Sequence, residues 1–180
     1  MRLAIPLSRR PLDAALVAFF GVNLLFTTYV VSLEQVVIAD PFHFTPPVWP
    51  PGPLLALVHW WERSFDPLLL ARPAWYRGTI WLDLLAFGPF YAFAVYAFVR
   101  GRDWIRTPAL LWSASLFTNV VVILFDELKG IHATPHPVTV VAANAAWLLV
   151  PVLVVWRLGF REHPFTIEAP EAAGSGGGAA

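Results

Sequence analysis

Two carboxylates stand inside long apolar stretches of the sequence, where an ionised side chain costs a few kcal/mol even on a lenient insertion scale. Glu34 lies near the end of the first stretch, and Asp83 lies about five residues into the second. At a rise of about 1.5 Å per residue, Asp83 is about 8 Å from the start of its helix. Two carboxyls close together in a low dielectric do not both ionise readily, so we predict a coupled pair that shares one proton.

Amide side chains of the third and fourth apolar stretches are expected at the same membrane depth as the two carboxylates. If the first helix runs outward and the second inward, Glu34 and Asp83 reach a similar depth, and Asn119 and Asn144 reach it from the other two helices. One polar residue on each helix predicts a shared small-molecule site with apolar walls. The aromatic residues expected in those walls are Tyr29, Phe87, Trp112 and Trp147. One charge within such walls suits a cationic or polar-headed hydrophobic ligand.

A structural role is the alternative for each of these polar residues. Asparagines in membrane helices often only hydrogen-bond between helices, at about 0.6 to 2 kcal/mol per contact. Glu34, at the end of its helix, is placed to reach water. A carboxylate at the depth of Asp83 is a costly way to join helices, and this cost favours a functional role for it.

The elements that must position these side chains are four membrane-spanning helices. The chain has 180 residues, of which 58% are hydrophobic and 13% charged, too apolar a composition for an ordinary soluble domain. A spanning helix needs about 20 predominantly apolar residues. We therefore expect an all-α fold, a four-helix transmembrane bundle with an internal ligand cavity. The predicted spans are 12–36, 78–99, 107–126 and 138–157.

The segments outside the spans predict the orientation. Eight arginines fall on the side of the termini and four Lys or Arg residues on the other, so we expect both termini in the cytoplasm. The long first loop, 37–77, contains LLALVHWWERSF, which is typical of a short helix that lies at the interface or folds over the bundle as a lid. Residues 1–11 form a cytoplasmic segment in this topology, and the Gly/Ala-rich composition of 161–180 predicts a disordered cytoplasmic tail.

Composition also removes several classes of function. The formal net charge is zero, which gives no basic surface for nucleic acid, and there is no cysteine for a disulfide or a thiolate site. No phosphate-binding loop, nucleophile elbow or zinc motif occurs, and we expect neither a metal nor a cofactor. The histidines are expected in loops or in the tail, so that none supplies a base buried in the bundle; they are His43, His59, His132, His136 and His163.

Three long strings carry a resemblance to a known family: DPLLLARPAWY at 66–76, YAFVRGRDWIRTPALLWS at 96–113 and AWLLVPVLV at 146–154. They closely resemble the sigma-2 receptor branch of the emopamil-binding-protein superfamily, also called the EXPERA domain. The resemblance covers residues 12–160. It implies a membrane bundle of four or five helices around a cavity for sterols and amphiphilic amines. Some members of that family isomerise a sterol double bond, whereas others bind or traffic sterols.

The resemblance also implies roles for particular residues. Asp66 matches a loop aspartate with a structural role. Asp83 matches the second-helix acid that lines the ligand cavity and is linked to a first-helix aspartate, which meets the ligand's amine. This chain has no aspartate at that position, and Glu34 and Ser32 are the two candidates for it. Asn144 and Trp147 occupy the positions at which the family's fourth helix presents tyrosine-type side chains to the cavity.

Three functions stay open. The first is non-enzymatic binding of a sterol-like or other polycyclic lipid, or of a cationic amphiphilic amine, by Glu34 and Asp83. The second is a Δ8–Δ7 sterol isomerase in which the same acids donate and accept the proton. In the isomerase branch a histidine one turn earlier partners the first-helix glutamate, whereas here that residue is Val30, which favours binding. The third is a structural accessory subunit of a membrane complex.

The host and the assembly are less determined by the sequence. The excess of Arg over Lys and the richness in Ala, Pro and Gly indicate a GC-rich genome. The membrane would be the cytoplasmic membrane of a bacterium or the endoplasmic reticulum of a eukaryote. Hopanoids or carotenoids are candidate ligands in a host that makes no sterols. A homodimer is compatible with the fold, although no stretch of the sequence requires one.

Overall fold

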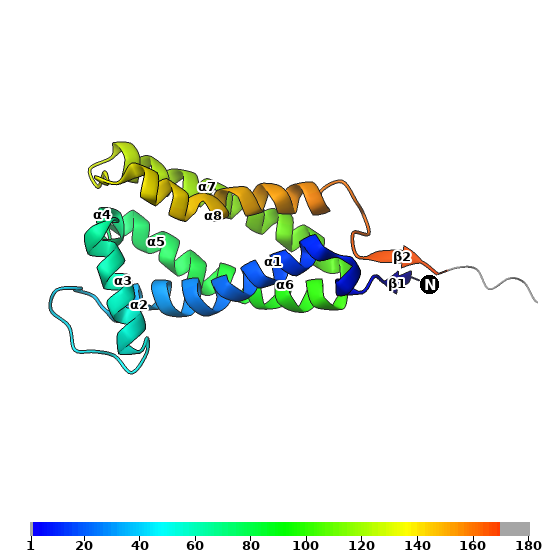
Figure 1. Ribbon diagram of the computed structural model, residues 1–180, viewed down its shortest axis with the longest axis horizontal. Coiled ribbons are helices and arrows are strands. Elements are labelled where there is room, and N and C mark those ends of the chain that lie inside the picture. The colour runs from blue at the N-terminus through cyan, green and yellow to red at the C-terminus, as the bar shows by residue number, and fades with distance from the viewer. Residues whose placement is uncertain (1, 170–180) are drawn as a thin grey trace, which may run out of the picture.

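The computed structural model describes residues 2–169, and four long helical segments packed side by side dominate it (Figure 1). Each segment is long and apolar enough to cross a membrane. The predicted all-α fold with four candidate spans is therefore confirmed. The second segment begins a full turn before the predicted residue 78, because Pro73 supplies a helix start there. The four segments are Pro11–Val37, Ala74–Arg100, Asp103–Lys129 and Pro137–Leu158.

The first two segments are each divided into three helical parts. The first consists of α1 (Pro11–Val22), the π-helical stretch η2 (Asn23–Ser32) and α2 (Leu33–Val37). The parts of the second are α5 (Ala74–Leu82), the π-helical stretch η3 (Asp83–Phe87) and α6 (Gly88–Arg100). The third segment is a 3-10 turn, η4 (Asp103–Ile105), followed by α7 (Arg106–Lys129), and the fourth is α8 (Pro137–Leu158).

The wider π-helical turns lie at membrane depth, where the two segments meet. Pro89, the second residue of α6, has no N–H to offer the carbonyl of Leu85, so one regular helical hydrogen bond is missing beside η3. Single π turns inside helices are frequent at functional sites. Ser32 is the last residue of η2, and Asp83 is the first residue of η3. Both polar residues therefore belong to the irregular part of the bundle.

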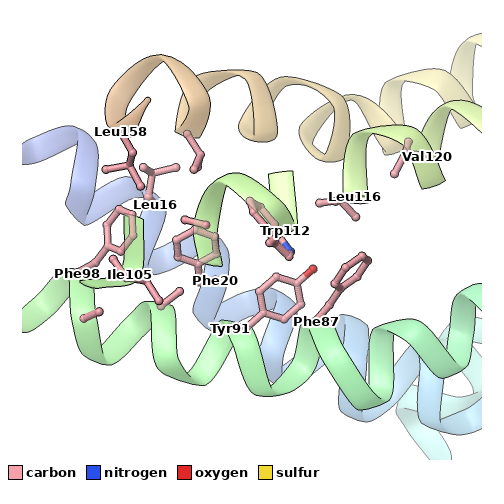
Figure 2. Packing of buried hydrophobic residues seen from close by; sticks show 14 of the residues in the cluster. Leu16, Phe20, Phe87, Tyr91, Phe98, Ile105, Trp112, Leu116, Val120 and Leu158 are labelled. Atoms are coloured by element: carbon pink, nitrogen blue, oxygen red, sulfur yellow. The ribbon is translucent and has the colours of Figure 1, made fainter. Parts of the chain in front are cut away.

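Two helix pairs form the bundle: α7 and α8 lie together, and α1 packs against α6 (Figure 1). The largest apolar cluster joins the pairs. Phe20 is fully buried within it and makes edge-to-face contacts with Trp112 at 5.3 Å and with Phe98 at 5.4 Å between ring centroids. Figure 2 shows this cluster running from Leu158 past Phe20 to Tyr91. Large aromatic side chains thus fill the half of the bundle nearer the chain termini, which we call the terminal end.

Two short helices lie across the opposite end, which we call the loop end (Figure 1). They are α3 (Gly52–Ser64) and α4 (Pro67–Ala71). Asp66 caps α4, because its side chain accepts a hydrogen bond of 2.8 Å from the backbone N–H of Leu69. The LLALVHWWERSF string forms most of α3, and one face of that helix is buried against the bundle. The lid-like helix expected from this string is therefore present.

The terminal end is closed by a two-stranded antiparallel sheet. Its strands are β1 (Arg2–Ala4), which precedes the 3-10 turn η1 (Leu7–Arg9), and β2 (Thr166–Glu168). Phe165 is fully buried against Phe98, and its carbonyl accepts a hydrogen bond from Ile5. This corrects the predicted disorder for residues 161–169, because a buried aromatic side chain holds this part of the tail. The rest of the predicted tail, 170–180, lies outside the described residues.

Candidate functional site

A cavity of about 380 Å³ lies in the loop half of the bundle, beneath α3. Its volume is in the range of about 300 to 1,000 Å³ that small-molecule sites occupy. All four long segments and α3 contribute side chains to it. Because aromatic rings fill the terminal half, the space that remains is confined to the loop half. The wall is mostly apolar and includes Leu57, Trp60, Trp61, Phe87, Leu116 and Trp147.

Asp83 is a buried acid of this cavity, and its partner is Ser32. The Ser32 hydroxyl donates a hydrogen bond of 2.8 Å to Oδ2 of Asp83. Both residues line the cavity, with Ser32 2% exposed and Asp83 8% exposed. The hydrogen bond joins the ends of two π-helical stretches from different segments. The sequence left Ser32 and Glu34 as alternatives for the first-helix position, and Ser32 is the one that contacts Asp83.

Four further residues predicted for the site line the cavity. Phe87, Asn119, Asn144 and Trp147 come from three different segments and meet at its wall. The Asn144 amide donates to the carbonyl of Val140 in its own helix at 3.0 Å. The Trp147 indole donates to the side chain of Asn23 at 2.6 Å and thereby ties α8 to the first segment. The predicted convergence of one polar side chain per helix thus holds for the second, third and fourth segments.

Tyr29 and Trp112, in contrast, do not line this cavity. Tyr29 is 48% exposed, and its carbonyl accepts a hydrogen bond from the indole of Trp49, outside the bundle. Trp112 is buried in the aromatic cluster, where it stacks on Phe90 with ring centroids 5.0 Å apart. Both predictions rested on depth alone, and the face of the helix on which a residue lies decides whether it reaches the cavity.

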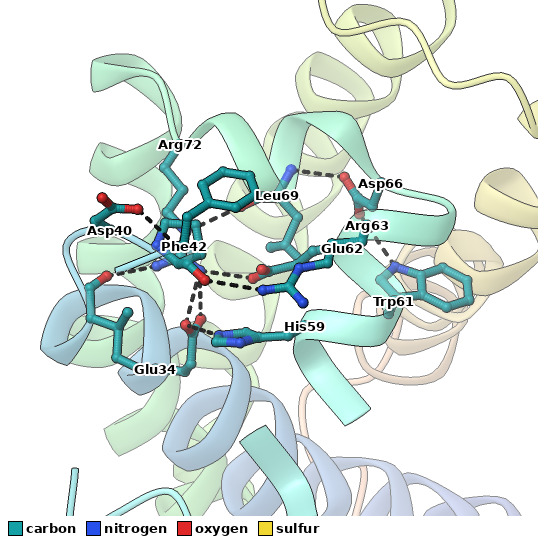
Figure 3. A network of polar contacts seen from close by, with 12 residues as sticks. Glu34, Asp40, Phe42, His59, Trp61, Glu62, Arg63, Asp66, Leu69 and Arg72 are labelled. Atoms are coloured by element: carbon teal, nitrogen blue, oxygen red, sulfur yellow. Dashed lines mark hydrogen bonds and ion pairs between the residues drawn. The ribbon is translucent and has the colours of Figure 1, made fainter. Parts of the chain in front are cut away.

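Glu34 lies in a separate buried network at the loop end (Figure 3). Its side chain is fully buried and does not line the cavity. The Arg72 guanidinium donates to Oε1 and Oε2 of Glu34 at 2.9 and 3.0 Å, and to Glu62 Oε1 at 2.9 Å. Glu34 therefore pairs with Arg72 and Asp83 with Ser32, and no hydrogen bond within residues 2–169 joins the two acids that were expected to share a proton.

His59 completes this network: it lies in the first loop, as expected, but it is buried against the bundle, where the sequence predicted no buried histidine base. Its Nε2 lies 2.9 Å from Oε1 of Glu34, and the residue is 6% exposed. The histidine that the isomerase branch has one turn before its glutamate is absent from the first segment, but α3 brings His59 to Glu34 from 25 positions along the chain. The prediction failed because it took a position in the first loop to mean that the histidine is not buried, whereas the buried face of α3 carries His59 onto the end of the first segment.

The network holds more carboxylate than cation. Burial, together with the charge of Glu34, raises the pKa of Glu62 to about 8, although Arg72 opposes this rise. One guanidinium cannot fully compensate two buried carboxylates, so a proton on Glu62 relieves the excess negative charge. The Arg72 side chain also donates to the carbonyl of Ile38 at 2.7 Å. These contacts fix α3 against the end of the first segment, and the opposite side of α3 roofs the cavity.

Arg72, Glu62 and His59 are the residues that sequence reasoning missed. His59 and Glu62 are three apart in α3, on the same face as Leu55 and Val58. Polar residues on the buried stripe of an amphipathic helix are the signal that could have found them. Arg72 ends α4 in the left-handed conformation, with φ 49° and ψ 51°, and no local sequence pattern marks its contact with Glu34.

The fold and the cavity together define a class of protein: a multi-pass integral membrane protein with a small-molecule-sized cavity inside its helical bundle. Comparison with known families agrees. The family model described as EXPERA (EXPanded EBP superfamily) matches residues 53–158. The chain belongs to the EXPERA family. The match begins at α3, so the first segment, which carries Ser32 and Glu34, lies outside it.

Individual relatives point to one branch of this family. The chain is 34% identical over 117 residues to the sigma intracellular receptor 2 of Homo sapiens, across 57% of this chain and 66% of that protein. It is 32% identical over 126 residues to the sigma intracellular receptor 2 of Xenopus tropicalis, across 64% of this chain and 74% of that protein. The match thus spans slightly less than two thirds of the human relative. These findings confirm the resemblance on which the sequence analysis relied.

Proposed function

We propose that this protein binds a sterol-like or other amphiphilic polycyclic lipid, or a cationic amphiphilic amine, in the cavity beneath α3. The observation that carries the proposal is the hydrogen bond of 2.8 Å between Ser32 and Asp83 in a mostly apolar wall. A buried carboxyl with one hydroxyl partner keeps acceptor capacity for a ligand's hydroxyl or ammonium group. The names of the relatives, intracellular receptors, are in keeping with a binding role.

The position of Glu34 favours binding over isomerisation. A double-bond isomerase needs one group that delivers a proton to the substrate and another that removes one. Of the two acids that the sequence offered for these roles, Asp83 lines the cavity, whereas Glu34 is fully buried against Arg72 and His59. Asp83 with its Ser32 partner suits recognition of a polar head, and the Glu34–Asp83 acid–base pair that isomerisation would use does not meet in this geometry.

Replacing Asp83 by Asn tests the proposal. We expect D83N to lose most of its affinity for a tritiated amphiphilic amine such as imipramine while its unfolding temperature in detergent stays close to that of the wild type. Asp40→Asn is a matched control, because Asp40 is exposed and makes its contacts within the first loop. Mass spectrometry of lipids that co-purify with the wild type and with D83N identifies the natural ligand.

Two results would decide against binding as the function. If D83N and the wild type retain the amine equally, the cavity acid has no part in recognition. If the wild type converts a Δ8 sterol to its Δ7 isomer and D83N does not, the protein is an isomerase and Asp83 its catalytic acid. If neither binding nor isomerisation is detected in the wild type, the structural accessory role is favoured.

A further inference from the structure

The cavity presents polar side chains at two levels, and the function proposed above uses one of them. Ser32 and Asp83 form the first level, at the meeting of η2 and η3. Asp66 and Tyr76 also line the cavity, nearer the loop end. On the helix that starts at Ala74, Tyr76 and Asp83 are seven residues apart, which places them on one face about 10 Å apart along the axis.

The second level, formed by Asp66 and Tyr76 and called here the loop-end level, is a buried polar site. Asp66 is 7% exposed, and its carboxylate accepts hydrogen bonds from the backbone N–H of Leu69 at 2.8 Å and from the indole of Trp61 at 3.4 Å. The neighbouring Glu127 is 2% exposed, and its Oε2 has no hydrogen-bond partner among the described residues. Desolvation by burial raises the pKa of Asp66. The carboxylate of Asp66 can accept a hydrogen bond from a ligand, and the phenol of Tyr76 can donate or accept one.

Apolar side chains separate the two levels. Leu69, Ile80, Val120 and Ile123 line the cavity, and each is an aliphatic residue without a hydrogen-bonding side chain. Ile80 is four residues after Tyr76 and three before Asp83, so it lies on the same helix face between the two polar levels. On this helix face the cavity wall is thus polar at Tyr76, apolar at Ile80 and polar again at Asp83.

We infer that the ligand is a rigid, elongated polycyclic molecule with a hydrogen-bonding group at each end, the two groups lying on the order of 10 Å apart. One end contacts Ser32 and Asp83, and the other contacts Asp66 and Tyr76. This inference rests on the proposed function, because it takes the cavity to be a lipid site. It adds the chemical class of the ligand: a molecule with a polar group at each end, in place of a lipid with a single polar head.

The cost of an unsatisfied polar group is the physical reason for a second head group. A ligand with one polar end would lay a hydrocarbon tail against Asp66 and Tyr76 and leave the remaining hydrogen-bonding capacity of these two side chains unused. A buried polar group left without a partner costs about 1 to 3 kcal/mol. Sites built to hydrogen-bond a substrate group therefore reject analogues that lack it more strongly than they reject analogues that lack a methylene.

Two steroids with the same ring system test the inference on the full-length protein in nanodiscs. The probes are 5α-androstan-3β-ol, with one hydroxyl, and 5α-androstane-3β,17β-diol, with hydroxyls at both ends. We expect the diol to bind at least about tenfold more tightly, which is the effect of one satisfied buried group. Tyr76→Phe should reduce the ratio of the two affinities, because it removes the phenol that the diol satisfies and the mono-ol does not.

Thr79→Val is the matched control for Tyr76→Phe. Thr79 also lines the cavity, but its hydroxyl donates to the carbonyl of Tyr76 in the same helix at 2.7 Å. Removing that hydroxyl should leave the preference for the diol intact. The comparison of the two steroids on the wild type tests the inference without any variant, so a folding defect in Tyr76→Phe does not decide the outcome.

The outcomes separate this inference from the function on which it rests. If both steroids bind the wild type with equal affinity, the two-ended ligand is overturned and lipid binding stands. If the diol is preferred but Tyr76→Phe and Thr79→Val keep that preference equally, the loop-end level is not the second contact, and the inference fails. If neither steroid binds while the wild type retains the amphiphilic amine, the two-ended ligand fails and amine binding stands. If neither the steroids nor the amine bind, the proposed function fails as well.

Discussion

His59 Nε2 lies 2.9 Å from Oε1 of Glu34, and this contact joins the lid helix α3 to the first membrane-spanning segment. Both residues are buried, and Arg72 approaches the same carboxylate from the end of α4. The carboxylate of Glu34 is therefore a structural anchor for the roof of the cavity.

Removing the cation of the network should destabilise the fold strongly. In Arg72→Met, two buried carboxylates lose their shared partner, and breaking a buried pair in this way typically costs about 3 to 5 kcal/mol. We expect a large fall in unfolding temperature, measured in detergent. Arg100→Met is the control, since Arg100 is exposed at the end of α6. An equal, small effect of both substitutions would contradict the role given to Arg72.

The network should also make stability depend on pH through Glu62. Its pKa is about 8 in the folded protein and near 4.5 in an unfolded chain, so the folded state holds a proton that the unfolded state releases between these values. Raising the pH through this window therefore lowers the free energy of unfolding. The groups facing Glu62 are Glu34, Arg72 and Asp66.

Glu62→Gln isolates this contribution, because a glutamine cannot lose the proton. We expect the unfolding temperature of E62Q relative to the wild type to rise from pH 5 to pH 9, since only the wild type becomes charged at this position. The neighbouring groups titrate in both proteins and cancel in the difference. A difference that stays flat over this range would show that Glu62 is ionised throughout, or protonated throughout.

Ser32→Ala should weaken ligand binding without unfolding the protein. The substitution removes the hydroxyl that donates to Asp83 at 2.8 Å and leaves the backbone unchanged. A neutral hydrogen-bond partner typically contributes about 0.5 to 1.5 kcal/mol, so we expect an effect on thermal unfolding within that range. The affinity for an amphiphilic amine should fall several-fold. Ser115→Ala, at an exposed position on α7, is the control for the loss of a hydroxyl.

Gly88 should not tolerate even a methyl group. A Cβ at this position would lie 2.7 Å from Cγ2 of Thr28, which is fully buried. Gly88→Ala would force apart the two segments that carry Ser32 and Asp83, so we expect losses of both stability and ligand affinity. Thr28→Ser removes the clashing methyl group, and the double variant should recover much of both properties. If Gly88→Ala alone behaves as the wild type, the close approach is not essential.

Asp13 should be the key acid of the terminal end. Its buried carboxylate accepts hydrogen bonds from Arg10 at 2.8 Å and from Arg157 at 2.9 Å, and both guanidinium groups lie over the ring of Phe165. Asp13→Asn leaves two arginines around a neutral amide, at a cost of about 3 to 5 kcal/mol. Thermal unfolding measures the cost. Amide hydrogen exchange should rise most at β1 and β2, and uniform exchange across the molecule would argue against a local latch.

Much of the fold was predictable, because a bilayer imposes a simple rule on the sequence. Four apolar runs of spanning length predicted the four segments, and the composition of LLALVHWWERSF predicted the helix over the loop end. The order of residues 161–169 was missed because the prediction extended the Gly/Ala-rich composition of the last residues to the whole tail. This order depends on one aromatic residue, Phe165, which finds a buried place against Phe98.

The site was predictable in its residue types and less so in its pairings. The depth of Asp83, Asn119 and Asn144 in their spans was enough to bring all three to one cavity. Depth does not give the rotation of a helix about its axis, and for that reason Tyr29 and Trp112 were placed in the wrong surroundings. The π-helical stretches make rotation harder to predict, because they change the number of residues per turn just where Ser32 and Asp83 lie.

The sequence by itself determined that this is a membrane protein of four spans, which family it resembles and which acids need partners. Each of these conclusions depends on short segments: the length of an apolar run, a local string of residues, or a single charge within an apolar run. Only the tertiary structure decided which partner each acid has. Ser32 and Asp83 are 51 positions apart, and Glu34 and Arg72 are 38 apart. Such contacts depend on how α3 and α4 fold over the bundle and how each helix is rotated within it, and local propensity does not encode either of these.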